Sequence, residues 1–112
     1  MTASKLYVVL VTTASLEEAT KIGEHLVSEQ LAACVNIVGP IRSLYLWDDK
    51  LNNDSEYLLI IKAGAENYAA LEQAVRERHS YQVPEILALE VAGCSPAYLQ
   101  WALSARPKSP NA

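Results

Sequence analysis

Four segments of the chain are largely apolar, and polar or turn-forming residues separate them. Apolar runs of this length that are rich in valine, isoleucine and leucine predict buried β-strands. The predicted strands cover residues 6–13, 33–47, 56–62 and 85–92. Gly39-Pro40 interrupts the second of them. Because proline lacks a donor for the strand ladder, we expect this strand at an edge of the sheet, with a bulge or bend.

Two segments between the strands have a helical period instead. From residue 16 to residue 27 apolar side chains recur every three or four positions, and Ser15 with Glu18 has the spacing of a capping box. A second helix is predicted over 66–79, because its last turn carries basic residues that the helix dipole favours. Pro96 is expected to open a short last helix.

The predicted order is βαββαβ with one helix added at the end. It indicates a ferredoxin-like α+β sandwich, in which two helices cover one face of a four-stranded antiparallel sheet. We expect one domain over residues 1–105 and a flexible, proline-containing tail over 106–112. The acidic stretch 48–54 is predicted to be a polar hairpin loop, since it lacks the spacing and the closing glutamate of a calcium loop.

Two helices leave the second face of such a sheet uncovered. The strand segments 6–11, 57–61 and 86–89 are nevertheless apolar at nearly every position, so both faces should be buried. If the second face were exposed to water, its contiguous apolar surface would exceed the few hundred Å² that monomers usually show. The sequence therefore predicts self-association. The alternative is that the short last helix covers this face alone.

Composition and charge narrow the range of partners. The chain has 112 residues, a net charge of -4 and a pI near 5.1, without a basic cluster, which argues against a nucleic-acid partner. No apolar run approaches the roughly 18 residues that span a bilayer. The apolar run after Lys5 is short for a signal peptide, so we expect a cytoplasmic protein. Cys34 and Cys94 form no CxxC motif, and Cys34 is expected to be an inert core thiol rather than a metal or redox group.

The stretch from Arg78 to Ile86 carries the candidate chemistry, because it places His79, Tyr81 and Glu85 at a predicted junction between a helix and a strand. An imidazole and a carboxylate suit Cu²⁺, Zn²⁺ or Ni²⁺, but two ligands do not make a tight site, so a third would come from a neighbouring subunit.

Structural roles for the same residues remain open. His79 could end a helix, Glu85 could pair with Lys62 or Arg78, and Tyr81 could anchor a turn through its hydroxyl. Tyr81, Lys62 and Glu85 could also act as acid–base groups. No residues fix a nucleophile and its base, however, so we expect no enzymatic activity.

The sequence resembles the CutA family of divalent-cation tolerance proteins over about Leu6 to Leu103. The matching segments are residues 8–14, 31–37, 41–47, 56–62, 79–86 and 98–101. The resemblance implies a ferredoxin-like fold, a compact homotrimer similar to the PII signalling proteins, a cytoplasmic location and a role in the response to metal ions. It implies no required cofactor. It also implies weak binding of copper or a similar divalent cation at a cleft between subunits.

The family's metal ligands map onto His79 and Glu85. Three other positions depart from its best metal-binding members: Val11 stands where some have a cysteine, Arg78 where some have a second histidine, and Ser80 where proline is usual. The resemblance further implies a cleft lined by Tyr81, Lys62 and Trp47. A PII-like trimer that binds a small molecule, and a structural trimer with an indirect metal phenotype, remain as alternatives.

Overall fold

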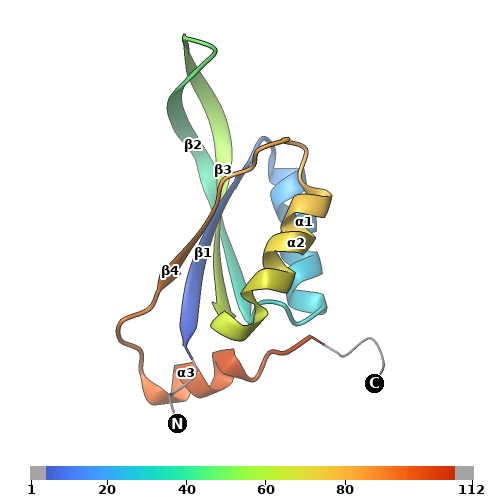
Figure 1. Cartoon of the computed structure of the whole chain (residues 1–112), viewed down its shortest axis with the longest axis vertical. Coiled ribbons are helices and arrows are strands. Elements are labelled where there is room, and N and C mark those ends of the chain that lie inside the picture. Colours follow the sequence, from blue (N-terminus) through green and yellow to red (C-terminus); the bar gives the residue numbers. More distant parts are fainter. Residues whose placement is uncertain (1–4, 108–112) are drawn as a thin grey trace.

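The computed structural model describes residues 5–107. The elements, in chain order, are β1 (Leu6–Thr13), α1 (Leu16–Ser28), β2 (Cys34–Trp47), β3 (Lys50–Gly64), the 3-10 helix η1 (Ala65–Asn67), α2 (Tyr68–Arg78), β4 (Ile86–Glu90) and α3 (Pro96–Leu103). The four strands form one antiparallel sheet in the order β2-β3-β1-β4. Figure 1 shows α1 and α2 together on one face of it. The predicted ferredoxin-like α+β fold is confirmed.

The core lies between the sheet and these two helices. We call the face of the sheet on which the helices pack the covered face. Alternate residues of the two central strands point into it, because side chains alternate between faces along a strand. Val9 and Val11 of β1 and Leu59 and Ile61 of β3 are fully buried there. The helices contribute their own buried residues, among them Ile22, Leu26, Leu71 and Val75.

The start of α1 confirms one half of the predicted capping box. The Ser15 hydroxyl accepts a hydrogen bond from the Glu18 amide at 3.1 Å. The Glu18 carboxylate accepts hydrogen bonds from Ser80, two residues after the end of α2. The predicted apolar stripe was wrong at its two ends, since Leu16 and Val27 are exposed.

The second helical segment is split, with η1 preceding α2. Asn67 at this joint is buried, and its amide donates to the carbonyl of Ala105 at 2.9 Å, which ties the chain after α3 to the start of α2. The domain boundary at residue 105 stays a prediction. Residues 108–112 of the predicted tail lie outside the described residues.

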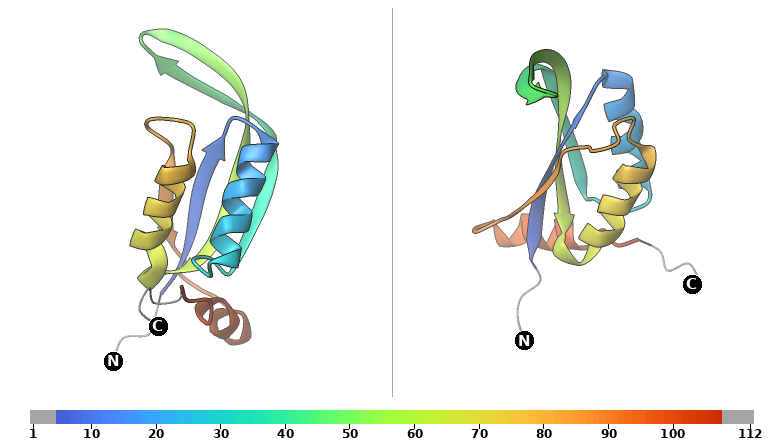
Figure 2. Two further views of the ribbon diagram at one scale, coloured as in Figure 1. Left: turned by 90° about the vertical axis from the view of Figure 1, so that its right-hand side faces the viewer. Right: turned by 45° about the horizontal axis from the view of Figure 1, so that its top comes forward.

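The hairpin of β2 and β3 differs most from the prediction. The loop predicted over 48–54 was wrong, because β3 begins at Lys50 and pairs directly with Trp47. Asp48 and Asp49 have φ of 53° and 61°, the left-handed values that a two-residue hairpin turn needs. The polar residues after Lys50 therefore form a strand whose two faces both meet water. We call residues 41–56 the arm, which projects beyond the rest of the chain (Figure 2).

The predicted irregularity in the edge strand is confirmed. β2 lies at one edge of the sheet, and its register with β3 shifts between Val38 and Ile41. Gly39 packs on the ring of Tyr57 there, and a Cβ at this position would come within 2.5 Å of the ring. Only glycine fits this close approach.

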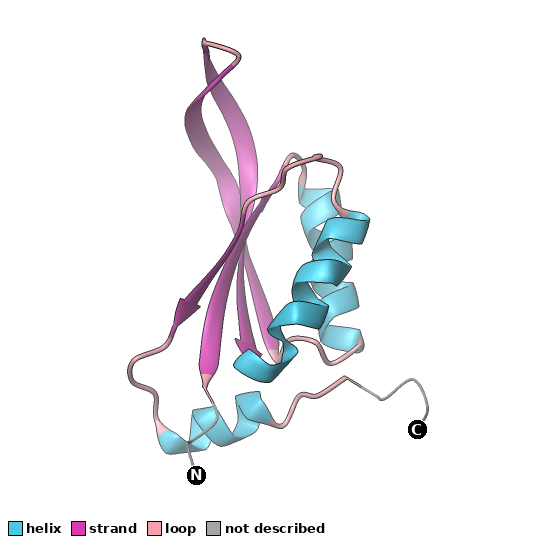
Figure 3. Ribbon diagram, viewed as in Figure 1, coloured by secondary structure: helices cyan, strands magenta, loops and turns pink. Residues whose placement is uncertain are grey.

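The second face of the sheet, which we call the open face, carries apolar side chains toward solvent. Leu87 and Leu89 of β4 are 52 % and 53 % exposed. The adjacent positions on β1 and β3 are half-buried, namely Val8, Leu10, Leu58 and Ile60. Helix α3 lies across the end of the sheet away from the arm (Figure 3). The alternative in which this helix covers the face alone is therefore not realised.

Cys34 also lies on the open face, because it pairs with Lys62 opposite Val8. It is half-buried and its Sγ is 3.9 Å from Asn36 Oδ1, so the prediction of a core thiol was wrong. Successive side chains of a strand point to opposite faces of the sheet, and a uniformly apolar sequence does not reveal which face each residue lies on. Over residues 5–107, no helix combines the length and the hydropathy that crossing a membrane requires.

Candidate functional site

His79 follows α2 directly and its side chain is fully enclosed. Nε2 lies 2.7 Å from the carbonyl oxygen of Thr12, and Nδ1 accepts a hydrogen bond from the Tyr81 amide at 3.0 Å. Because Nδ1 is the acceptor, the ring proton sits on Nε2 and is donated to Thr12. The imidazole thus joins the end of α2 to the end of β1, and both ring nitrogens are occupied.

Ser80 takes part in a second link between the helices. Its amide donates to Glu18 Oε2 at 2.7 Å and its hydroxyl donates to Glu18 Oε1 at 3.1 Å. Glu18 Oε2 is also 3.6 Å from His79 Nδ1. Ser80 therefore fixes this segment through a carboxylate of α1.

Tyr81 anchors the same segment to β3. Its hydroxyl donates to Glu56 Oε2 at 2.8 Å, and its ring lies 4.8 Å from the ring of His79. Burial, followed by the hydrogen bond to Glu56, raises the pKa of Tyr81 well above its ordinary value. The predicted alternative role of Tyr81, anchoring a turn through its hydroxyl, is realised.

A cavity of about 620 Å³ opens between the arm and the segment 81–85, and we call it the arm cavity. Its lining residues are Thr12, Ser43, Leu44, Tyr45, Trp47, Asn52, Glu56, Tyr81, Gln82, Val83 and Glu85. Its size falls in the range of small-molecule sites, about 300–1,000 Å³. The Tyr45 hydroxyl donates to Asp54 on the opposite strand of the arm, and this hydrogen bond raises the pKa of Tyr45.

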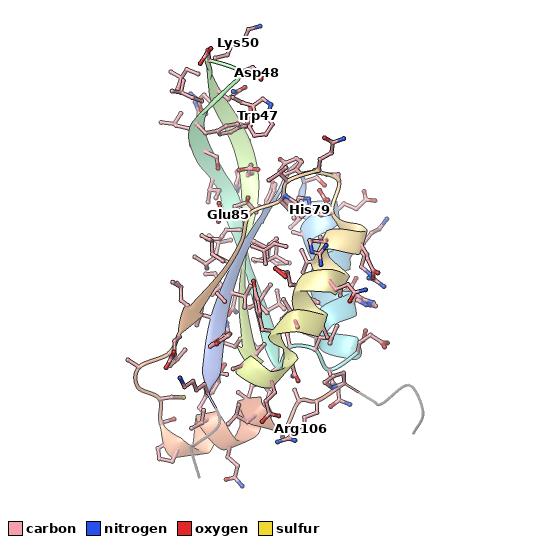
Figure 4. All side chains as sticks on the ribbon, in the orientation of Figure 1. Trp47, Asp48, Lys50, His79, Glu85 and Arg106 are labelled. Carbon is pink, nitrogen blue, oxygen red and sulfur yellow. The ribbon has the colours of Figure 1, made fainter. Side chains whose placement is uncertain are left out.

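The structure brings together three of the five site residues that the sequence proposed. Tyr81, Trp47 and Glu85 line the arm cavity, and Figure 4 places Trp47 far along the arm with Glu85 at the start of β4. Lys62 lies apart on the open face, where it donates to the side chain of Asn36 and to the carbonyl of Ile60. His79 is held by the backbone contacts described above.

Glu56 was missed by the sequence analysis, although it is the most buried carboxylate of the site at 6 % exposure. A glutamate directly before an apolar strand was the available signal, because an acid at the margin of a core usually has a partner. Tyr45 was missed, although it lies in the predicted strand 33–47, because its partner Asp54 was assigned to a loop.

The residues proposed as metal ligands do not fit a metal ion in this conformation. Both nitrogens of His79 are engaged, and no group of three His, Cys, Asp or Glu side chains suited to a metal occurs in the described part of the chain. Glu85 is exposed and forms no ion pair with Lys62 or Arg78 within residues 5–107. Arg78 donates to the carbonyl of Ala74 at 3.2 Å instead. Ligation by His79 and Glu85 stays a prediction.

The fold and site define a class: small ferredoxin-like domains with a long hairpin arm and an apolar open face. The profile described as "CutA1 divalent ion tolerance protein" matches residues 7–105. The chain therefore belongs to the CutA1 divalent ion tolerance family.

Individual relatives support the same family assignment. The chain is 46% identical over 94 residues to "Protein CutA, chloroplastic" of Arabidopsis thaliana, covering 84% of this chain and 52% of that protein. It is 44% identical to "Divalent-cation tolerance protein CutA" of Thermus thermophilus, covering 84% of this chain and 91% of that protein. The chain thus spans about half the length of the plant relatives it matches. The crystal structure of CutA1 from Oryza sativa has a TM-score of 0.90 at 40% identity, covering 94% of this chain and 96% of that one.

These comparisons correct the expected location. Two plant relatives are named chloroplastic, and the structure from Archaeoglobus fulgidus is described as that of a periplasmic protein. The prediction of a cytoplasmic location, drawn from the short apolar run after Lys5 and from the family resemblance, was therefore wrong. The relatives' names describe tolerance to divalent cations, and none of those cited is the name of an enzyme.

Proposed function

We propose that this chain acts as a self-associating divalent-cation tolerance protein without enzymatic activity, in which three copies pack through the open faces of their sheets. The observation that carries the proposal is the open face itself. Leu87 and Leu89 extend an apolar surface begun by half-buried residues of β1 and β3. Contiguous surfaces of this kind mark interaction sites.

The arm supports the same conclusion. Leu46 and Leu51 near its tip are 71% and 74% exposed, and Trp47 between them is 60% exposed. Apolar side chains on a projecting hairpin gain burial only against another molecule, and self-association supplies identical partners for arm and face together. The number three comes from the resemblance of the sequence to its family.

The metal role is proposed to depend on assembly. Weak binding of copper or a similar divalent cation at a boundary between copies would require His79 to release the Thr12 carbonyl, or would use Glu85 with a ligand from another copy. Calorimetric titration of Cu²⁺ into the wild type and into a variant with His79→Ala and Glu85→Ala tests this. Unchanged heats would remove both residues from metal binding.

Sedimentation over a hundredfold range of concentration tests the assembly. We expect a mass three times 12.3 kDa for the wild type. Leu87→Asp should release single copies, because it places a charge in the interface. Leu16→Asp is a matched control, since Leu16 is 51% exposed on α1, outside the open face. A wild type that sediments as a single copy at micromolar concentration would contradict the proposal.

A second candidate is a small-molecule-binding assembly, which the arm cavity favours. The cavity combines apolar walls with a few convergent polar groups, as ligand sites do. A thermal-shift screen with nucleotides, organic anions and organic cations tests it. A flat response to the whole panel would count against a ligand site.

A further inference from the structure

The charged side chains that line the arm cavity all have the same sign. The charged side chains lining it are the carboxylates of Glu56 and Glu85, and no lysine, arginine or histidine is among its described lining residues. Asp54 adds a third carboxylate close by, hydrogen-bonded to the lining residue Tyr45. A concave site whose charges are all negative attracts cations and repels phosphates and carboxylates.

Glu56 supplies a partly unused carboxylate. The residue is 6% exposed, and its Oε2 accepts the hydrogen bond from Tyr81. Oε1 accepts no hydrogen bond from the described residues. Because no fully enclosed side-chain nitrogen or oxygen in residues 5–107 lacks a partner, Oε1 is not fully enclosed, and Glu56 is one of the residues that line the arm cavity. A carboxylate this buried is stabilised by a charged donor that reaches it.

Three of the other lining residues are aromatic. Tyr45, Trp47 and Tyr81 all line the cavity, and both tyrosine hydroxyls donate to carboxylates. Aromatic rings attract cations over their faces and also accept an apolar body. A hydrated metal ion gains little from such walls. The lining also contains no histidine or cysteine, and two carboxylates alone do not complete a divalent site.

We propose that the arm cavity binds a small organic cation: a primary amine or guanidinium group carried on an apolar body. The cationic group would donate to Glu56 Oε1 deep in the cavity. Glu85 would add attraction at the exposed side, and the body would lie among the aromatic side chains. This assignment rests on the second candidate function, that the assembly binds a small molecule, and it names the class of that molecule.

A charge series of matched probes tests the assignment on the full chain. Tyramine, tyrosol and 4-hydroxyphenylacetate share one aromatic body and carry a positive, a zero and a negative charge. We expect calorimetry and NMR titration to detect tyramine binding at least about tenfold tighter than tyrosol, with no binding of the anion. The guanidine derivative of tyramine, which carries a single guanidinium on the same body, tests the guanidinium group in the same way.

Two charge-neutralising variants locate the site. Glu56→Gln keeps an acceptor for Tyr81 and should weaken tyramine binding about tenfold, and Glu85→Gln about threefold. The second residue is exposed, so its variant stays informative if the first fails to fold. Glu29→Gln, an exposed carboxylate after α1, is the control and should bind tyramine as the wild type does.

The outcomes separate the ligand class from the site. Equal or tighter binding of tyrosol or of the anion would overturn the cation but keep a small-molecule site. Cu²⁺ that binds with dependence on Glu56 while tyramine does not would make the cavity a metal site and overturn the proposal. Tyramine binding confined to the Leu87→Asp variant would show that a second copy fills the cavity, and would overturn a free ligand. No binding by any probe would overturn both ligand proposals and leave the assembly to its own test.

Discussion

On β3, Leu58 and Leu59 are neighbours in sequence but belong to opposite faces of the sheet. Leu59 is fully buried beneath the helices, whereas Leu58 is half-buried on the open face. The same residue type therefore contributes to the fold on one face and is available for association on the other. The difference teaches that apolar content alone does not separate folding from assembly, and that strand parity does.

The largest expected effect comes from the covered face. Leu59→Ala should lower the free energy of unfolding by about 3–5 kcal/mol, because it leaves a cavity in a packed core. Denaturant unfolding measures it. Leu58→Ala should cost less and should shift the assembly equilibrium instead, which sedimentation detects. Equal losses of stability with unchanged assembly would break the comparison between the faces.

A second effect concerns the junction that closes the covered face. His79→Ala should lower the unfolding free energy by about 2–4 kcal/mol, because it removes hydrogen bonds to Thr12 and Tyr81 and leaves a buried gap. Denaturant titration at fixed protein concentration measures it. His25→Ala on α1 is the matched control and should change stability by less than about 0.5 kcal/mol. An unchanged unfolding free energy in His79→Ala would contradict the structural role of His79.

Tyr81→Phe should cost about 1–3 kcal/mol, because it leaves the buried Glu56 carboxylate without its donor. The raised pKa of Tyr81 also sets a pH dependence. A group whose pKa rises on folding stabilises fully below its unfolded pKa, so this contribution should persist below about pH 10 and fall above it. Thermal unfolding from pH 7 to pH 11 should show a steeper alkaline loss in the wild type than in Tyr81→Phe. Parallel plots of thermal stability against pH for the two proteins would contradict this contribution of Tyr81.

The smallest effect is expected at the tip of the arm. In the Leu87→Asp background, where copies should be separate, Leu51→Ser should change the unfolding free energy by less than about 0.5 kcal/mol, because its side chain is 74% exposed. In the otherwise wild-type chain the same change should weaken association. A loss above about 2 kcal/mol in the separated copy would show that the arm packs on its own body.

The fold could be predicted because local and periodic signals agreed. Ser15, the helical period of α1 and the apolar strands each pointed to the same architecture. The second strand of the arm was missed because Asp48-Asp49 is a weaker turn signal than Asn-Gly, and polar residues on a strand exposed on both faces have no alternation to follow.

The candidate site was only partly predictable for a related reason. Tyr81 and Glu85 lie close together in the sequence, whereas Glu56 reaches Tyr81 from a strand far along the chain. One of the two groups bonded to the His79 ring is likewise distant in sequence, since the Thr12 carbonyl belongs to β1, whereas the Tyr81 amide is two residues away. No spacing rule encodes the contact with Thr12, so the occupied Nε2 could not be foreseen.

The two-residue turn at Asp48 and Asp49 has a consequence for the order of folding. It lets β2 and β3 zip together from the turn, pairing residues close in sequence, a process that takes about 1–10 μs in isolated hairpins. β4, by contrast, joins β1 through pairs such as Val11 and Ile86, so its closure carries a larger loop entropy and should come late. Until β4 docks, the edge of β1 is unpaired, and a newly made chain is most exposed to aggregation in that interval.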